Sequence, residues 1–251
     1  MTLFDTKDVN SLRRVTFLIA VELDSEQRLT NLIEQLKYLR AIGSPVFLYE
    51  SSKTQQLPSL VDLTGINYRF FECNLLHRTK LFNIMATDTD ADVMVLHDVD
   101  VFLPISQLID AVTSIENGTD FCYPYVHWKA TKSIANLDVP TITDESVGGS
   151  VLCKRSSFFA AGMENEYFKS WGIEDLERFT RWQILGYIVR RVDGSLYHME
   201  HWRDDRYNEP NEPWQRNLDE YKKVKAMTKD ELLRYIKTWP WCNLRASRGL
   251  L

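Results

Sequence analysis

The sequence has few cysteines and no long apolar run, and both absences narrow what the chain can be. Its four cysteines, Cys73, Cys122, Cys153 and Cys242, are far apart and form no Cys-x-x-Cys pair. Neither a zinc knuckle nor a dense disulfide framework is therefore predicted, and a reducing compartment is the simplest interpretation. The longest apolar stretches have the length of a strand, and the N-terminus lacks the apolar core of a signal peptide. We therefore expect a cytoplasmic protein without a transmembrane span.

Excess positive charge and glycine-rich motifs are also missing. The formal net charge is -5, so no broad positive field is available to hold nucleic-acid phosphates. The sequence contains no Gly-x-x-x-x-Gly-Lys-Ser/Thr, no Gly-x-Gly-x-x-Gly and no Gly-x-Ser-x-Gly pattern. Because these patterns mark phosphate loops, dinucleotide sites and hydrolase nucleophiles, a P-loop hydrolase and a nicotinamide enzyme are not supported. We expect no nucleic-acid partner.

Apolar runs of strand length alternate with segments of helical periodicity in the first part of the chain. Residues 15–21 (VTFLIAV) predict a strand, and residues 26–42, which end at Gly43, predict a helix. Further strands are expected at residues 45–50, 66–71, 93–96, 121–126 and 150–153, and further helices at 78–87, after Pro104 and at 175–185. This alternation predicts an α/β fold with a mainly parallel sheet that is buried on both faces.

Two segments of the second half predict irregular or turning structure. Residues 129–147 lose periodicity and are rich in Ser, Thr and Asp, so we expect a long loop there. A loop of that length inside a compact domain is usually functional. The Asp193-Gly194 pair separates strand-like runs at residues 187–192 and 195–199, which predicts a β-hairpin.

The C-terminal end combines a predicted helix with aromatic and basic residues. Thr228-x-x-Glu231 is a capping box that opens this helix. Tryptophan and cations favour a membrane interface, so the tail either rests on a membrane surface or packs on the catalytic domain. We expect one catalytic domain, residues 1–218, and a helical, basic appendage, residues 219–251. The tail residues concerned are Trp239, Trp241, Arg245 and Arg248.

Two aspartates separated by one valine, an Asp-x-Asp (DXD) pair, follow the predicted strand 93–96. In an open parallel sheet, ligands bind beyond the carboxyl ends of the strands. Residues two apart in an extended segment project to the same side, so Asp98 and Asp100 can face one cation. Mg²⁺ and Mn²⁺ take carboxylate oxygens and commonly bridge to substrate phosphates. The alternative is an ordinary turn, in which aspartate is common.

Two other clusters have residue types that carry chemistry. His198 and His201 follow the predicted hairpin, and imidazole suits Mn²⁺ and other borderline metals, so the pair would complete a site begun by Asp100. The alternative is a pair of half-exposed polar residues at a strand end. Glu174 and Asp175 begin a predicted helix. There a carboxylate either stabilises the helix dipole or serves as general base toward a substrate hydroxyl. These residues alone leave both choices open.

The order and spacing of four segments resemble the inverting β-1,4-galactosyltransferases and their bacterial capsule-polymerase relatives, which have the GT-A fold. HRTKLFN, residues 77–83, looks like the family's NRAKLLN, and DVDVFLP, residues 98–104, looks like DVDLIP. Residues 148–177 resemble the family's block that begins with Gly-Gly and contains WGWGGED. HMEHWRDDRYNEPN, residues 198–211, is similar to MIRHSRDKKNEPN. The resemblance covers over half of the chain and implies a Rossmann-like GT-A domain with a mixed, mostly parallel sheet.

The resemblance implies a role for each matched residue. Asp100 and His201 match metal ligands, and His198 stands where galactosyltransferases have a methionine ligand, which implies a harder site for Mn²⁺ or Mg²⁺. Asp175 matches the catalytic base, and Glu174 matches its neighbour that contacts sugar hydroxyls. The remaining matches imply donor or sugar contacts for Arg78, Asp98, Gly149 and Trp171.

Three departures from the family pattern bear on the substrates. Leu176 replaces an aspartate that helps to hold the acceptor, and Ile173 replaces a glycine. Both changes imply an acceptor other than the family's usual N-acetylglucosamine. The family's N-terminal FRNRE segment, which helps to bind the nucleotide, corresponds to residues 22–26, and these lack both arginines.

The resemblance therefore implies a metal-dependent glycosyltransferase that moves a hexose, galactose or N-acetylgalactosamine, from a UDP-sugar with inversion. We expect a saccharide or lipid-linked saccharide acceptor and a place in bacterial surface or capsule polysaccharide synthesis at the inner face of the membrane. Residues 129–147, with the segment around Trp171, would close over the donor and exclude water. A retaining or differently specific GT-A transferase is one alternative. A catalytically inactive sugar-nucleotide-binding subunit is the other, but it would need no base at Asp175.

Overall fold

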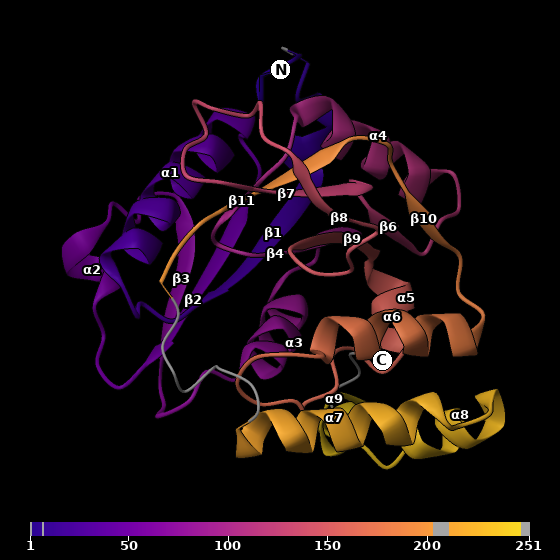
Figure 1. Cartoon of the computed structure of the whole chain (residues 1–251). Helices are drawn as coiled ribbons and strands as arrows, with labels where there is room; N and C mark the ends of the chain where they lie inside the picture. Colours follow the sequence, from indigo (N-terminus) through magenta and orange to yellow (C-terminus); the bar gives the residue numbers. More distant parts are fainter. Residues whose placement is uncertain (1, 7, 203–210, 247–251) are drawn as a thin grey trace.

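A computed structural model describes residues 2–6, 8–202 and 211–246, and its centre is a seven-stranded sheet (Figure 1). β1 pairs in parallel with β2 and β4, while β9 runs antiparallel between β4 and β6. The predicted mixed, mostly parallel sheet is therefore confirmed. From one edge to the other, the strands are β10 (Val189–Arg191), β6 (Phe121–Tyr123), β9 (Ser150–Lys154), β4 (Val93–His97), β1 (Val15–Val21), β2 (Val46–Ser52) and β3 (Ile66–Glu72).

Helices surround this sheet, and their ends show why the sequence places them there. Ser25 caps α1 (Glu26–Ile42) by accepting a hydrogen bond from the Arg28 amide, and Gly43 ends it in a left-handed conformation (φ 76°). α3 (Arg78–Asp88) packs on β1, and α4 (Ile105–Glu116) packs on β6 and β9. The other helical segments are η1 (Asn10–Arg14), α2 (Leu57–Leu60), α5 (Arg155–Ala160), α6 (Glu174–Leu185), α7 (Glu212–Lys225), α8 (Lys229–Ile236) and α9 (Pro240–Ala246).

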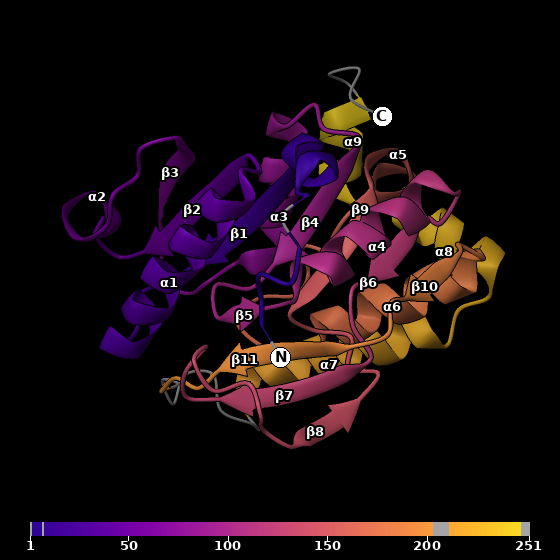
Figure 2. The ribbon, with the colours of Figure 1, turned by 90° about the horizontal axis from the view of Figure 1, so that it is seen from above.

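A second, four-stranded sheet corrects two predictions. It has the order β5 (Val101–Phe102), β11 (Ser195–Met199), β7 (His127–Thr131) and β8 (Thr141–Asp144), and its last three strands run side by side in Figure 2. Residues 129–147 are therefore not one long loop. The predicted hairpin at Asp193-Gly194 is also wrong, because β10 joins β6 in the large sheet whereas β11 joins β5 and β7 in the small one.

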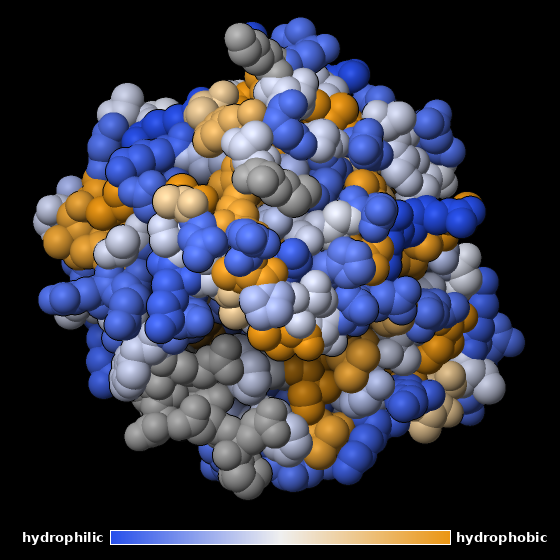
Figure 3. Space-filling view, turned by 45° about the horizontal axis from the view of Figure 1, so that its top comes forward, coloured by the Kyte–Doolittle hydropathy of each residue, from blue (hydrophilic) through white to orange (hydrophobic). Residues whose placement is uncertain are grey.

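The C-terminal tail packs on the rest of the chain. Trp239 is fully buried, and the Trp241 indole donates a hydrogen bond to the Gly162 carbonyl at 3.2 Å. Both rings are therefore packed inside the protein. The Arg245 side chain and Arg248 lie outside the described residues. No described helix is both long enough and apolar enough to cross a membrane. On the face in Figure 3, hydrophobic side chains form several separate areas with hydrophilic side chains between them.

Candidate active site

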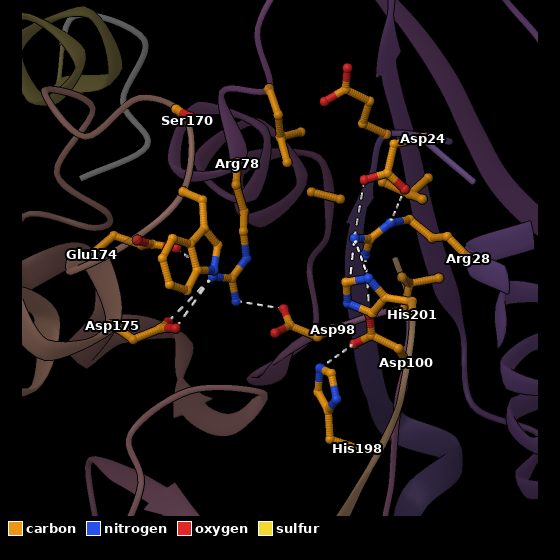
Figure 4. Close-up of a pocket in the computed structure, with 16 residues that line it drawn as sticks. Asp24, Arg28, Arg78, Asp98, Asp100, Ser170, Glu174, Asp175, His198 and His201 are labelled. Atoms are coloured by element: carbon orange, nitrogen blue, oxygen red, sulfur yellow. Dashed lines mark hydrogen bonds and ion pairs between the residues drawn. The ribbon is translucent and has the colours of Figure 1, made fainter. Parts of the chain in front are cut away.

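A cavity lies beyond the carboxyl ends of β1 and β4, and the starts of three helices and the end of β11 complete its wall (Figure 4). This is the edge at which open parallel sheets bind ligands. The structure thus brings together residues that are far apart in the chain. The charged and imidazole side chains in its wall are Glu22, Asp24, Arg28, Arg78, Asp98, Asp100, Glu174, Asp175, His198 and His201.

Asp100, His198 and His201 form a cluster that could hold a metal ion. Their potential ligand atoms all lie within 4.8 Å of one another. The two Asp100 oxygens face His198 Nε2 at 3.4 Å and His201 Nε2 at 3.1 Å. His201 Nδ1 lies 2.7 Å from the Trp202 carbonyl, and a proton held there would leave the Nε2 lone pair to a metal ion. One carboxylate and two imidazoles suit Mn²⁺ and similar divalent cations.

The two aspartates of the Asp-x-Asp pair differ in their protonation. Burial raises the pKa of Asp98 to about 7, because Arg78 offsets the lost hydration only in part. Burial acts in the same direction on Asp100, but His198, His201 and Arg28 lower the pKa of that carboxyl well below its usual range. Asp100 is therefore fully ionised at neutral pH, whereas Asp98 is only partly ionised, and Asp100 is the better candidate for a metal ligand.

Arg78 joins the two sides of the cavity. Its Nη2 donates to Asp98 at 2.6 Å, and its Nη1 lies 2.8 Å from Glu174 and 3.4 Å from Asp175. One guanidinium is thus shared among three carboxylates. Figure 4 shows Arg78 between the acidic pair at the start of α6 and the metal-ligand cluster. This place fits a residue that contacts a ligand spanning the cavity.

Asp175 is held by two arginines. Arg178 Nη2 donates to Asp175 Oδ1 at 2.6 Å, and Arg178 Nη1 donates to the buried Glu164 at 3.0 Å. Burial raises the pKa of Asp175, but Arg78 and Arg178 lower it more, so the carboxylate stays ionised. Burial and the neighbouring Asp175 raise the pKa of Glu174. Asp175 is therefore a fixed carboxylate that is available to accept a proton.

The segment around Trp171 is strained. Ser170 (φ 66°) and Ile173 (φ 72°) have left-handed backbone conformations, as has Gly172 between them (φ 105°). Such a conformation is rare and costly for a β-branched residue, on the order of 1–3 kcal/mol. Trp171 lines the cavity and is 37% exposed. The chain thus holds an aromatic ring at the cavity mouth in a conformation that local sequence preferences oppose.

Two residues next to the Asp-x-Asp pair, His97 and Gly149, support the cavity from behind its wall. His97 is fully buried, and its ring nitrogens lie 2.8 Å from Gln35 Nε2 and 2.9 Å from Ser150 Oγ. Gly149 lies against the small sheet, where an added Cβ would meet a Leu196 methyl at 3.1 Å. Its carbonyl accepts a hydrogen bond from the Asp98 amide at 2.8 Å. Gly149 therefore fixes the backbone at Asp98 rather than lining the cavity.

The sequence interpretation missed Arg28 and Arg178, and it gave Asp24 no role beyond its place in residues 22–26. Arg28 pairs with Asp24 at 2.8 Å and with Asp100 at 3.1 Å. Asp24 and Arg28 are four residues apart at a helix start, a spacing at which a local ion pair is ordinary. No local signal in the sequence could have shown that this pair faces Asp100.

Comparison with known proteins connects this geometry to one kind of enzyme. Residues 129–204 match a family model described as the N-terminal domain of galactosyltransferase. No curated protein matches the sequence. The matched residues include β8, β11 and both histidines of the metal-ligand cluster.

Solved structures show the fold. The catalytic domain of Drosophila β1,4-galactosyltransferase 7 in complex with xylobiose superposes with a TM-score of 0.53 at 17% identity, over 85% of this chain and 81% of that chain. The S. aureus protein TarS (residues 1–349), in complex with UDP-GlcNAc, superposes with a TM-score of 0.57 at 11% identity, over 87% of this chain and 69% of that chain. GalNAc-T7 with UDP, GalNAc and Mn²⁺ superposes with a TM-score of 0.58 at 13% identity, over 94% of this chain and 55% of that chain. The chain thus has the fold of the GT-A glycosyltransferases, and residues 129–204 resemble the galactosyltransferases.

Proposed function

We propose that the protein transfers a hexose from a UDP-sugar to a saccharide acceptor with inversion at the anomeric carbon. The observation that carries the proposal is the placement of Asp175 and the Asp100, His198 and His201 cluster in the wall of one cavity, with Arg78 between them. A base and a metal-ligand cluster on two sides of a cavity fit an acceptor hydroxyl and a departing diphosphate.

The charge of the cavity supports a cation as part of the ligand. Six carboxylates and two arginines line it, which leaves four formal negative charges when the histidines are neutral. Such a surface repels a diphosphate unless a divalent cation enters with it. Mn²⁺ or Mg²⁺ at Asp100, His198 and His201 would supply charge neutralisation at the leaving group.

The remaining steps belong to the chain's own residues. Arg78 would contact the donor, with Asp98 beside its sugar and ribose and Trp171 over the sugar. Glu174 would accept hydrogen bonds from sugar hydroxyls. Asp175 would take the proton of the acceptor hydroxyl while that oxygen attacks the anomeric carbon from the face opposite the leaving UDP. Arg178 would hold Asp175 in place during the transfer.

Galactose or N-acetylgalactosamine is the donor sugar we propose, and similar folds support the UDP-sugar part of this proposal. A variant of Drosophila β1,4-galactosyltransferase 7 was crystallised with manganese, UDP-Gal and xylobiose, and GalNAc-T7 was crystallised with UDP, GalNAc and Mn²⁺. We also propose a lipid-linked or free saccharide acceptor, a role in surface polysaccharide synthesis, and a catalytic domain at residues 1–218 with an appendage at residues 219–251.

The test is UDP release from a panel of UDP-sugars with Mn²⁺, Mg²⁺ or EDTA, with product stereochemistry read by NMR. We expect turnover of one donor that needs metal and is lost in Asp100→Ala and Asp175→Asn. Asp110→Ala, an exposed change on α4, is the matched control and should keep full turnover. Metal-independent release, or equal rates in all three variants, would refute the proposal, and a retained configuration would refute inversion.

A further inference from the structure

Arg28 lies where a metal ion would bind, although no sequence motif identifies it. Its Nη1 donates to Asp100 Oδ2 at 3.1 Å, and its Nη2 lies 3.1 Å from His201 Nδ1 and 3.4 Å from His201 Nε2. His201 Nε2 carries the lone pair if Nδ1 holds the proton against the Trp202 carbonyl. The guanidinium thus reaches two of the atoms that would coordinate a cation.

A second anchor keeps Arg28 beside the cavity. Its Nε donates to Asp24 Oδ1 at 2.8 Å, and its Nη2 donates to Asp24 Oδ2 at 3.4 Å. This is the two-pronged pairing that a guanidinium prefers with a carboxylate. The Arg28 side chain is 17% exposed and the Asp24 side chain is 3% exposed, so the pair is shielded from water. Arg28 can therefore leave Asp100 without leaving the cavity wall.

Arg28 and a divalent cation cannot both use the same lone pairs of Asp100 Oδ2 and His201 Nε2. A cation held by these atoms would repel the guanidinium that lies 3.1 Å from Asp100 Oδ2, so its entry would displace the Nη1 contact. The freed N–H groups would then face the space in which the donor's diphosphate is neutralised. Phosphate oxygens are the acceptors that a guanidinium pairs with most strongly. Among the described residues of this wall, only Arg28 and Arg78 carry a permanent positive charge.

We propose that Arg28 occupies the metal-ligand atoms while the site is empty and binds the diphosphate of the sugar nucleotide once the metal has displaced it. This inference rests on the proposed function, since it needs the divalent cation and the nucleotide donor. It assigns to α1 the nucleotide contact for which residues 22–26 provide no arginine or lysine. It also predicts that removal of the Arg28 side chain strengthens metal binding and weakens nucleotide binding.

The experiment measures two affinities of the full chain by titration calorimetry, first Mn²⁺ alone and then UDP at saturating Mn²⁺. In Arg28→Met we expect Mn²⁺ to bind about 5- to 10-fold more tightly, because a competing cation is gone. We expect UDP to bind at least about 10-fold more weakly, because a charge-assisted hydrogen bond is lost. In Arg28→Lys the positive charge stays, so Mn²⁺ affinity should stay near that of the wild type while UDP affinity falls.

The control is Arg40→Met, which removes an exposed arginine from the other end of the same helix, where it pairs with Asp62. Neither affinity should change in this variant. If both affinities fall together in Arg28→Met, or neither changes, Arg28 only braces Asp24 and the inference is overturned. If the wild type binds no Mn²⁺, or Asp100→Ala binds it equally well, the metal site itself fails, and the proposed function fails with it.

Discussion

Replacing Arg178 by methionine should destabilise the protein strongly, because it removes the shared partner of two acidic groups. Arg178 and Glu164 are each 2% exposed in their side chains, whereas Asp175 is 22% exposed. Removing one member of a buried ion pair costs about 3–5 kcal/mol, since the other charge stays buried without compensation. Most of that cost falls on Glu164, because Asp175 keeps Arg78 and some contact with water. We therefore expect a loss of about 3–5 kcal/mol in the free energy of unfolding.

Urea unfolding followed by circular dichroism measures this loss, and a second substitution identifies its source. In Arg178→Met with Glu164→Gln, no uncompensated charge is buried, so at least about 1 kcal/mol of the loss should return. The exposed Arg190→Met is the control and should change stability by less than about 0.5 kcal/mol. Additive costs in the double variant, or a loss below about 1 kcal/mol in Arg178→Met, would refute the argument from the buried pair.

Three further predictions concern parts of the fold outside the cavity. Burial lowers the pKa of His97 to about 4, so the folded state binds fewer protons than the unfolded chain, and stability should fall by up to about 2 kcal/mol from pH 7 to pH 5. Urea titrations should show this slope reduced in His97→Gln, and equal slopes would contradict it. Gly162→Ala should cost about 2–4 kcal/mol in thermal unfolding, because φ is +88° and the new Cβ would lie 2.9 Å from Trp239; an unchanged melting temperature would mean that the tail does not pack there. Thr228→Ala should cost about 1 kcal/mol in the same assay by removing the capping box of α8, and Thr228→Ser should restore most of it.

The first half of the fold could be predicted because its signals are local. β1 and α1 have the predicted bounds, since an apolar strand, a serine cap and a glycine stop each act within a few residues. The small sheet could not be predicted in the same way. All four residues of β8 are exposed, so that strand has no apolar pattern. The Asp-Gly turn was correct as a turn, but which sheet each flanking strand joins depends on partners elsewhere in the chain.

The residues of the candidate site likewise divide into those with a recognisable sequence signal and those that only tertiary packing places there. Asp100, His198 and His201 could be named from their residue types and from a family resemblance, and the structure brings them together. Arg28 could not be named, because its contact with Asp100 joins residues 72 positions apart. Arg178 was missed for a related reason. An arginine in a helix is ordinary, and only tertiary packing shows that it is buried between Asp175 and Glu164.

The pairing of β11 with distant strands determines when the metal-ligand cluster can form during folding. Asp100 is synthesised long before His198 and His201, and the cluster cannot close until β11 pairs with β5 on one side and β7 on the other. Such long-range pairing is slow, because loop closure precedes the contacts that stabilise it. A cation held by the cluster would oppose local opening of β11, so amide exchange in Ser195–Met199 should slow on Mn²⁺ addition while β3, at the far edge of the large sheet, keeps its rate. The strand that brings the two histidines to Asp100 is thus held in place by pairing with segments that are far away in the sequence.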